Sequence, residues 1–483
     1  RHSTMVYLLE GLWLLIFTVS VQAEVPWRYL TMIDAGSSGC RAHVFHWRPS
    51  GAGIEVDPKH ESLKVKPGLS TFASNPTQAG DSLKELLAFV QEKIPSSHHS
   101  TSPLWLKATA GLRMIPQAAS EAILESVRDT LEVSPFHFDR EWARVIPGSD
   151  EGGFGWLSVN YLLGNLDHGS TPEFKTVVEM GGASAQVTQL VSIGGKSAPQ
   201  DYGFTFNSAG GDVYELYTYS YLGWGLEKAR EALSSSIMGD GVQEVAFDPC
   251  LNKGFVAEKD AKSNVYDGPE PVQVVGVSTH EKCSAAIDDL FKDANEAAVA
   301  KNGGCPHPSC SFGGTYQPVT LASTQVWAFE NFYYTAKMLD VPAPASSPHD
   351  LATAADKVCA LTWDELNAHY PLDDSDKEEN NKLCFSATFL EKFLTNGLGL
   401  QAQAGITIQQ SIDGQGIDWS LGAAIHEASE LMSTQGGIFS SFMIFIQSHG
   451  AMLLGGPFLA VLCCHCMSMH RKRTALDLDS RKK

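Results

Sequence analysis

The chain has 483 residues, of which 43% are hydrophobic and 19% are charged. This composition is that of a globular protein, and the length is enough for two or three domain-sized units. Asp and Glu number 55 against 35 Lys and Arg, which gives a formal net charge of −20. Such a balance argues against a protein that binds nucleic acid, because contacts to many phosphates require a basic face. If the substrate is anionic, a bound cation must help to hold it.

The N-terminal segment has the pattern of a secretory signal peptide. An apolar run over residues 7–21 leads into Val21, Gln22 and Ala23, which place small residues where signal peptidase requires them. We therefore expect residues 1–23 to form a signal peptide. No Lys or Arg lies between Met5 and the apolar run, so a buried N-terminal helix remains the alternative.

Two segments repeat a pattern of strand, tight turn and returning strand. In residues 28–47, YLTMI precedes the turn DAGSSG, and RAHVFHW follows it. In residues 177–191, VVEM precedes GGAS, and AQVTQLV follows it. An acidic residue, Asp34 or Glu179, lies at the end of each first strand. The alternation and the Gly/Ser clusters predict two β-hairpins.

Paired turns of this kind have a specific chemistry. Glycine lets backbone amides approach a phosphate closely, serine hydroxyls add donors, and a carboxylate can hold a cation that bridges to phosphate oxygens. A single Gly-rich turn is usually only a turn. Two matched turns that face each other would form a phosphate clamp.

Two helices are predicted between the hairpins. Apolar residues recur at three- and four-residue spacing in SLKELLAFVQEKI (82–94) and SEAILESVRDTLEV (120–133). This spacing is typical of amphipathic helices, which would cover the sheet that contains the first hairpin. These patterns favour an α/β fold.

The ten cysteines fall into groups. Cys40 lies beside the first turn, and three further cysteines between 463 and 466 lie at a predicted membrane edge, where palmitoylation is more plausible than a disulfide. For the other six we expect nearest-neighbour disulfides, as an oxidising compartment allows. A zinc site at Cys305 and Cys310 is the alternative, although a second short-spaced pair is missing. The six are Cys250, Cys283, Cys305, Cys310, Cys359 and Cys384.

The C-terminal segment has the pattern of a membrane anchor. Residues 438–467 are almost free of formal charge and precede a basic cluster at 470–473. A helix needs about 20 apolar residues to cross a bilayer, and the basic cluster would stay cytosolic. We expect a single-pass type I protein with a transmembrane region at 438–467 and a cytosolic tail at 468–483. Polar residues and a proline interrupt the run, so a cleaved lipid-anchor signal competes with this interpretation.

Five ordered segments resemble the apyrase conserved regions of the nucleoside triphosphate diphosphohydrolase family, a branch of the actin, Hsp70 and sugar-kinase superfamily. They are DAGSSGCR (34–41), KATAGLR (107–113), IPGSDEGGFGWLSVNYLLG (146–164), VVEMGGASAQV (177–187) and DWSLGAA (418–424). The resemblance covers roughly residues 28–430. It implies two related actin-like (RNase H-like) α/β lobes, at 28–162 and 163–417, with the active site in the cleft between them. Residues 418–435 would form a C-terminal helix that returns to the first lobe.

The resemblance implies an enzyme that hydrolyses the terminal phosphates of nucleoside tri- or diphosphates. Glu151 matches the general base, Thr109 a residue near the attacking water, and Ser184 and Gln186 the pair that positions this water. Arg113 is expected to be structural. Water is a weak nucleophile toward an anionic phosphate, so a carboxylate base and a cation with amide donors suit this chemistry.

The resemblance also implies the ligand-binding residues. Asp34 and Glu179 are expected to hold Mg²⁺ or Ca²⁺, with Asp34 orienting metal-bound water. Trp419 and Tyr334 match aromatic residues that bind the base, a contact that tolerates any base because each has a π-face. Two loops are expected to contact the phosphates, namely Ser37, Ser38 and Gly39 in the first and Gly181, Gly182 and Ala183 in the second.

Two residues depart from the family pattern. Cys40 occupies the place of a Thr or Ser, so a hydroxyl contact is missing and a free thiol lies beside the phosphate loop. Glu179 stands where Asp is commoner, and its extra methylene would shift the carboxylate by about an ångström unless the backbone compensates. This second departure leaves the metal geometry open.

Other functions remain open from the sequence. An exopolyphosphatase, a kinase of the same superfamily, or a catalytically silent membrane receptor would share the paired loops. The motifs KATAGLR and WSLG favour a nucleotide, and no segment identifies the second substrate pocket of a kinase. The single C-terminal anchor resembles that of endomembrane apyrases, so a Golgi or other endomembrane location is expected, with the cell surface as the alternative.

Overall fold

The computed structural model describes residues 25–433, except for 51–52, 167–171, 209, 239–244, 258–272, 320, 322–324 and 372–376. The expected signal peptide (1–23) and transmembrane region (438–467) lie outside the described residues. In the described part of the chain, no helix is both long enough and apolar enough to span a bilayer. The described residues up to Ala428 form one compact unit, which contains every sheet.

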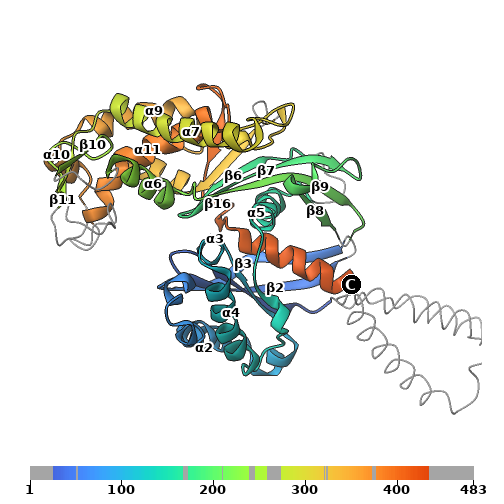
Figure 1. Ribbon diagram of the computed structural model, residues 1–483. Helices are drawn as coiled ribbons and strands as arrows, with labels where there is room; N and C mark the ends of the chain where they lie inside the picture. Colours follow the sequence, from blue (N-terminus) through green and yellow to red (C-terminus); the bar gives the residue numbers. More distant parts are fainter. Residues whose placement is uncertain are drawn as a thin grey trace, which may run out of the picture. The chain divides into compact units, whose positions relative to one another are not determined.

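The first hairpin lies at the centre of a five-stranded sheet in the order β3-β2-β1-β4-β5. β1 runs antiparallel to β2 and parallel to β4. The two expected amphipathic helices are present as α2 (Lys84–Lys93) and α4 (Gln117–Glu132), and their apolar faces are buried in the core beside this sheet (Figure 1). The strands are β1 (Arg28–Ala35), β2 (Cys40–Ser50), β3 (Gly53–Val65), β4 (Leu104–Ala108) and β5 (Ala143–Val145).

The second hairpin lies in a seven-stranded sheet in the order β14-β15-β13-β6-β7-β9-β8. β6 runs antiparallel to β7 and parallel to β13, so the strands from β9 to β15 repeat the order and directions of the first sheet. The predicted pair of related α/β lobes is confirmed, and we name the two lobes by these sheets. The strands are β14 (Ala345–Ser346), β15 (Ile406–Ile408), β13 (Val326–Glu330), β6 (Thr176–Met180), β7 (Ser184–Ile193), β9 (Val213–Leu222) and β8 (Gly203–Asn207).

The glycine-rich helix α5 (Gly148–Leu162) packs against the second sheet (Figure 1). A Cβ on Gly152 would lie 2.4 Å from the hydroxyl of Thr218, and one on Gly153 would lie 2.6 Å from the ring of Phe204. Both distances are shorter than a carbon atom tolerates, so only glycine fits at these positions. The close approach holds the first turn of α5, with Glu151, against β7 and β9.

A C-terminal helix begins at Trp419 and is described as far as 433. It crosses α5 at Gly422, where a Cβ would lie 1.9 Å from the carbonyl oxygen of Phe154. Farther along, Glu427 forms an ion pair with Lys107 of β4. The helix therefore joins α5 to the first sheet.

A helical layer covers the second sheet and shares one apolar core with it. A small sheet in the order β10-β12-β11 and a two-stranded hairpin complete the second lobe. The remaining elements are α3 (Ala110–Arg113), α6 (Leu226–Met238), β10 (Val245–Asp248), β11 (Val256–Ala257), β12 (Gln273–Gly276), α7 (His280–Asn302), α8 (Asn331–Met338), α9 (Pro348–Ala360), α10 (Trp363–His369), α11 (Leu383–Lys392), β16 (Ser411–Ile412) and β17 (Gln415–Gly416).

The six cysteines form three disulfides in the expected nearest-neighbour pairs. The alternative zinc site at Cys305 and Cys310 is wrong, because these two sulfur atoms are bonded to each other. The other two disulfides lie in the core of the second lobe. They are Cys250–Cys283, and Cys359–Cys384, which joins α9 to α11.

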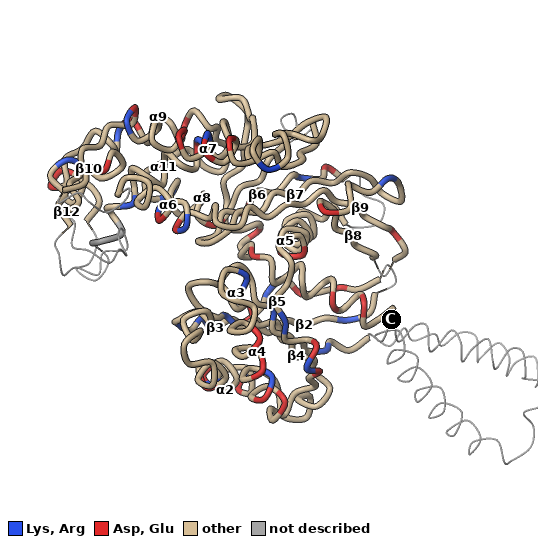
Figure 2. Tube along the Cα trace, viewed as in Figure 1, with Lys and Arg blue, Asp and Glu red and all other residues tan. Residues whose placement is uncertain are grey.

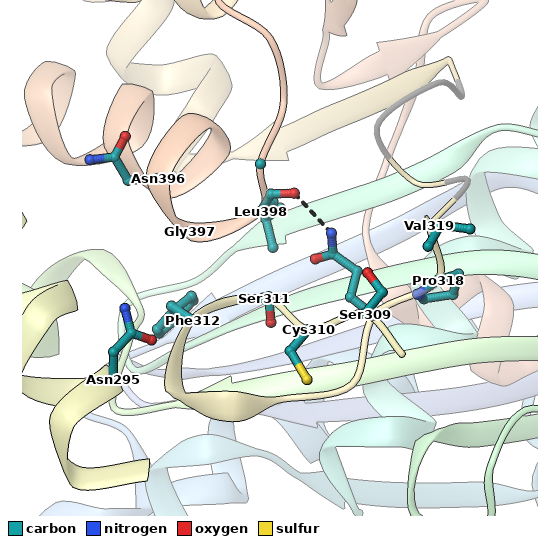
Figure 3. Close-up of a pocket in the computed structure, with 12 residues that line it drawn as sticks. Asn295, Ser309, Cys310, Ser311, Phe312, Pro318, Val319, Asn396, Gly397 and Leu398 are labelled. Atoms are coloured by element: carbon teal, nitrogen blue, oxygen red, sulfur yellow. Dashed lines mark hydrogen bonds between the residues drawn. The ribbon is translucent and has the colours of Figure 1, made fainter. Parts of the chain in front are cut away.

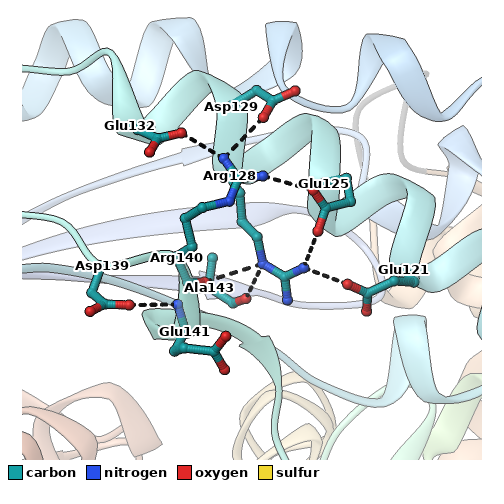
Figure 4. Close-up of polar contacts among 9 residues, drawn as sticks. All are labelled: Glu121, Glu125, Arg128, Asp129, Glu132, Asp139, Arg140, Glu141 and Ala143. Carbon is teal, nitrogen blue, oxygen red and sulfur yellow. Dashed lines mark hydrogen bonds and ion pairs between the residues drawn. The ribbon is translucent and has the colours of Figure 1, made fainter. Parts of the chain in front are cut away.

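An ion-pair network lies along α4 (Figure 4), where acidic and basic residues follow one another closely in the chain (Figure 2). Arg140 contacts Glu125 at 2.7 Å, Asp129 at 3.0 Å and Glu132 at 2.6 Å. Arg128 contacts Glu125 at 2.7 Å and also donates to the carbonyl oxygen of Ala143 in β5 at 3.1 Å. Exposed ion pairs contribute little free energy each. The connection from α4 to the sheet is the hydrogen bond from Arg128 to Ala143 of β5.

The first prediction concerns the disulfide between Cys359 and Cys384, which closes a loop over a sequence separation of 25. The loop-entropy relation gives roughly 3 kcal/mol for a loop of this length and about 2 kcal/mol for one of five residues. The double variant Cys359→Ala/Cys384→Ala should therefore melt at a lower temperature than the parent. In scanning calorimetry, the control Cys305→Ala/Cys310→Ala should show a smaller decrease in melting temperature. An equal or larger decrease in the melting temperature of the control would contradict the prediction.

Candidate active site

The two hairpins have the same loop geometry. In the first, the Gly36 amide donates to the Gly39 carbonyl at 2.9 Å; in the second, the Gly181 amide donates to the Ser184 carbonyl at 3.0 Å. Each loop has four residues between the last paired positions of its strands. Asp34 therefore occupies in β1 the position that Glu179 occupies in β6, which confirms the repeated pattern.

The loop amides can donate hydrogen bonds to an anion. Within the described part of the chain, no acceptor is found for the amides of Ser37 and Ser38, or for those of Gly182 and Ala183. A Cβ on Gly225 would lie 2.5 Å from the amide nitrogen of Ala183, so a side chain there would cover the second loop. Two turns whose backbone amides have no acceptor match the concave arrangement of hydrogen-bond donors that binds phosphate.

Five carboxylates gather around these loops. Burial raises the pKa of Glu179 well above its usual range. The negative charges of Glu151, Glu330, Asp34 and Asp418 raise it further. Burial likewise raises the pKa of Asp34, with further increases from Asp418 and Glu151. Carboxylates shift one another in this way only when they are close and poorly solvated. We call the group the acidic cluster; its members are Asp34, Glu151, Glu179, Glu330 and Asp418.

The acidic cluster has the chemistry of a site for a hard cation. Asp34 Oδ1 and Glu179 Oε2 are buried and have no hydrogen-bond partner among the described residues. Mg²⁺ is commonly held by one or two carboxylates together with water and substrate phosphates. Asp34 and Glu179, at equivalent positions in the two hairpins, therefore fit a cation that is shared with a phosphate.

Three predicted catalytic residues are in contact. Gln186 Nε2 lies 3.1 Å from Glu151 Oε2 and 2.7 Å from Ser184 Oγ. Arg113 also donates to Glu151 Oε2, and Ser220 Oγ lies 3.0 Å from Gln186 Nε2. All of these groups are buried or half-buried. The contacts join α5 to α3 on one side and to β7 and β9 on the other.

Arg113, which is expected to be structural, donates to the carboxylate of Glu151. Arg113 is the last residue of α3, and Thr109, the residue before this helix, donates its amide to the Ala35 carbonyl at 3.2 Å. Thr109 and Arg113 therefore both lie beside the first hairpin. The motif KATAGLR indicated the position of Arg113 but not its partner.

The two predicted base-binding aromatic residues differ in exposure. Trp419 is only 4% exposed, and its ring stacks on Phe154 at a centroid distance of 6.3 Å. Its ring therefore packs in the core between α5 and the C-terminal helix. Tyr334 is 51% exposed, and the charges of Glu330 and Asp418 act on it. Tyr334 is thus the accessible aromatic residue beside the acidic cluster.

Glu330 and Gln410 were missed by sequence reasoning. Glu330 ends β13 with a φ of 58°, an uncommon conformation for a residue other than glycine, which often marks a functional site. Its amide donates to Gln410 Oε1 at 2.7 Å, and Gln410 Nε2 donates back to its carboxylate at 2.9 Å. The segment FENFYYTAKML contains Glu330, but no sequence pattern indicates the reciprocal pair.

Cys40 is buried and forms no disulfide, as expected from its place in the first motif. Burial raises the pKa of this thiol to about 12, and the nearby Asp34 adds to the effect. At neutral pH the side chain is therefore a neutral thiol. It packs in the core of the first lobe and offers no thiolate to a metal or a substrate.

A separate hollow of about 430 Å³ lies in the second lobe (Figure 3). Gln317 donates across it to the Leu398 carbonyl at 2.8 Å, and the Cys305–Cys310 disulfide lies beside it. It shares no lining residue with the acidic cluster. The described residues that line the hollow include no charged side chain, so they offer neither a general base nor a carboxylate ligand for a cation.

Comparison with known proteins agrees with this geometry. The chain matches the GDA1/CD39 (nucleoside phosphatase) family over residues 21–439. It is 36% identical over 420 residues to probable apyrase 3 of Arabidopsis thaliana, and the match covers 82% of each chain. It is 30% identical over 426 residues to the guanosine-diphosphatase of Schizosaccharomyces pombe, covering 83% of this chain and 74% of that one.

A solved structure shares the fold. The nucleoside triphosphate hydrolase structure from Neospora caninum superposes with a TM-score of 0.60 at 16% identity, and the alignment covers 89% of this chain and 97% of that one. The likeness extends over both lobes. The family match over residues 21–439 and the identity to probable apyrase 3 show that the chain belongs to the GDA1/CD39 family of nucleoside phosphatases.

Proposed function

We propose that this enzyme releases the terminal phosphate of nucleoside tri- and diphosphates by direct attack of water, with Glu151 as the general base and with Mg²⁺ or Ca²⁺ as cofactor. The observation that carries the proposal is the contact from Glu151 through Gln186 to Ser184, at the start of β7. It links a proton acceptor to the second phosphate hairpin through a single amide group.

The contacts of Glu151 suit a general base. Arg113 and Gln186 both donate to Oε2, and no hydrogen bond to Oε1 is found among the described residues. Oε1 can therefore accept a proton from water while Oε2 keeps the side chain in place. As the water oxygen bonds to phosphorus, its proton passes to Glu151 and the bridging oxygen leaves with the shortened nucleotide.

The phosphate would lie between the two hairpins. The amides of Ser37 and Ser38 would donate from one side and those of Gly182 and Ala183 from the other, while Asp34 and Glu179 would hold the cation. When bound, the cation would offset the negative charge that builds up on the phosphate oxygens in the transition state. Ser184, Gln186 and Thr109 would orient the water.

We assign base binding to Tyr334 alone, since Trp419 is buried. A half-exposed aromatic ring stacks on any base, so a broad base range is expected. Hydrolysis of diphosphates is supported by the likeness to a guanosine-diphosphatase.

For location, the predicted signal peptide and membrane anchor and the three disulfides support the lumen of the secretory pathway, in the Golgi or another endomembrane. In this arrangement the catalytic lobes face the lumen and the lipid bilayer holds the C-terminal anchor. The outer face of the plasma membrane is the alternative.

The second prediction tests the base. Glu151→Gln keeps the shape of the side chain but removes its basicity, so turnover should fall by roughly 10²- to 10⁴-fold while nucleotide binding is retained. The neighbouring Asp150 is the matched control. The positive charges of Arg144 and Lys107 act on Asp150, whereas that of Arg113 acts on Glu151. Initial rates should be measured on nucleoside di- and triphosphates and on polyphosphate, with Mg²⁺, Ca²⁺ or a chelator present.

Asp150→Asn should lose much less activity, and ¹⁸O from solvent should appear in the released phosphate without a phosphoenzyme. If Glu151→Gln kept the parent rate, or if Asp150→Asn were the inactive variant, Glu151 would not be the base. Preference for polyphosphate over every nucleotide would instead indicate an exopolyphosphatase. Full activity in excess chelator would contradict the metal requirement.

The third prediction uses the pKa of Glu151. Burial raises this pKa, and the charge of Arg113 opposes the increase. The base must be unprotonated, so activity is lost as the pH falls through the pKa of Glu151. Arg113→Gln removes the opposing charge, and the acidic limb of the kcat profile should therefore move to higher pH.

Ser220→Ala is the control for Arg113→Gln. Ser220 Oγ lies 3.4 Å from Arg113 and 3.0 Å from Gln186, but it carries no charge. The acidic limb of this control should stay close to that of the parent. An acidic limb of Arg113→Gln that is unmoved, or that moves to lower pH, would show that another group controls it.

A further inference from the structure

Two histidines and an aspartate from three separate segments meet at the edge of the acidic cluster. His43 lies in β2, His60 in β3, and Asp418 directly before the C-terminal helix. One ligand atom of each residue lies within 4.8 Å of those of the other two. Among the described residues, this is the only group of three such side chains with that spacing.

A β-bulge brings the two imidazoles together. Val44 pairs with Glu61 and His46 with Asp57, so that Pro58, Lys59 and His60 lie opposite a single residue of β2. A bulge changes the direction of a side chain relative to regular pairing. The result is a distance of 2.9 Å between His60 Nε2 and His43 Nδ1.

The hydrogen bonds around the pair fix the tautomer of His60. His60 Nδ1 lies 3.0 Å from the Pro58 carbonyl oxygen. A carbonyl only accepts, so the proton of neutral His60 is on Nδ1 and the lone pair of Nε2 points toward His43. A histidine that binds a metal through one nitrogen usually donates from the other in this way.

The carboxylate of Asp418 is also fixed. One oxygen, Oδ1, accepts a hydrogen bond from the Ser420 amide at 2.7 Å. The other, Oδ2, lies 3.8 Å from His43 Nδ1, which is too far for a hydrogen bond. A hydrogen bond between the two histidines would explain their distance, but it would leave this carboxylate oxygen without a contact to the pair.

We propose that His43, His60 and Asp418 bind a transition-metal ion, with Zn²⁺ as the best match, at a site separate from the Mg²⁺ or Ca²⁺ position at Asp34 and Glu179. Imidazole nitrogen favours zinc over hard cations, and three protein ligands with one open position form a common zinc arrangement. Tetrahedral ligands at about 2.0 to 2.1 Å from zinc lie about 3.3 Å apart. His43 Nδ1 lies 2.9 Å from His60 Nε2 and 3.8 Å from Asp418 Oδ2, and these two distances lie on either side of this value.

Zinc at this position would join the β2–β3 pair to the start of the C-terminal helix. Asp418 also belongs to the acidic cluster, since its charge raises the pKa of Asp34. Binding would therefore reduce the negative charge that acts on the candidate active site. It would also connect the first sheet to the segment that packs on α5.

The test uses the full chain in millimolar Mg²⁺, which occupies hard-cation sites but competes poorly for imidazole. Zn²⁺ is titrated by calorimetry, and Co²⁺ is titrated by visible absorption, which reports tetrahedral coordination. The parent should bind one Zn²⁺ per chain and show the tetrahedral Co²⁺ spectrum. His60→Gln, at a half-buried position, should weaken Zn²⁺ binding at least about tenfold and abolish that spectrum, and Asp418→Asn should weaken binding as well.

The matched control is His46→Gln, on β2 like His43, where the ring packs on Tyr29 at a centroid distance of 4.7 Å. This variant should bind Zn²⁺ like the parent, and so should Asp34→Asn, which keeps the test separate from the proposed hydrolytic function. Equal melting temperatures of His60→Gln and the parent in chelator would show that the variant folds. A parent without stoichiometric Zn²⁺ binding in Mg²⁺, or His60→Gln with parental affinity, would overturn the proposal.

Discussion

The buried negative charge of the acidic cluster is the constraint on which the rest of the site depends. A carboxylate removed from water must be protonated, paired or bound to a cation, because an isolated buried charge is very unfavourable. Arg113 pairs with Glu151, whereas Asp34 Oδ1 and Glu179 Oε2 have no partner in the described structure. A bound cation is the partner that also suits an anionic substrate. The net charge of the whole chain pointed to the same requirement.

Much of the fold was predictable because it rests on local patterns. Alternating residues around Gly/Ser turns define both hairpins, and the spacing of apolar residues defines α2 and α4. The six cysteines form the three nearest-neighbour disulfides that were expected. Within the site, Asp34 and Glu179 were identifiable from their equivalent places before the turns, and Glu151 from the resemblance of its segment to a family motif.

Other features depend on contacts between distant segments, which local patterns do not encode. Arg113 meets Glu151 only because α3 and α5 approach each other, and Trp419 is buried because Gly422 lets the C-terminal helix lie against Phe154. A tryptophan in a sequence motif fits a core and a base platform equally well. The approach of His60 to His43 follows from a bulge, which shifts the register of β3 without a sequence signal.

The most direct test of the central claim is Mg²⁺ binding to the full chain saturated with a non-hydrolysable nucleotide. The Mg²⁺ affinity is measured by calorimetry for the parent, for Asp34→Asn, for Glu179→Gln and for the double variant. If both carboxylates hold one shared ion, each single variant should lose most of the Mg²⁺ affinity and the double variant should lose little more, because contacts to a common ligand are not additive. Fully additive losses, or a parent that binds the nucleotide equally well with and without Mg²⁺, would contradict a cation held jointly by the two hairpins.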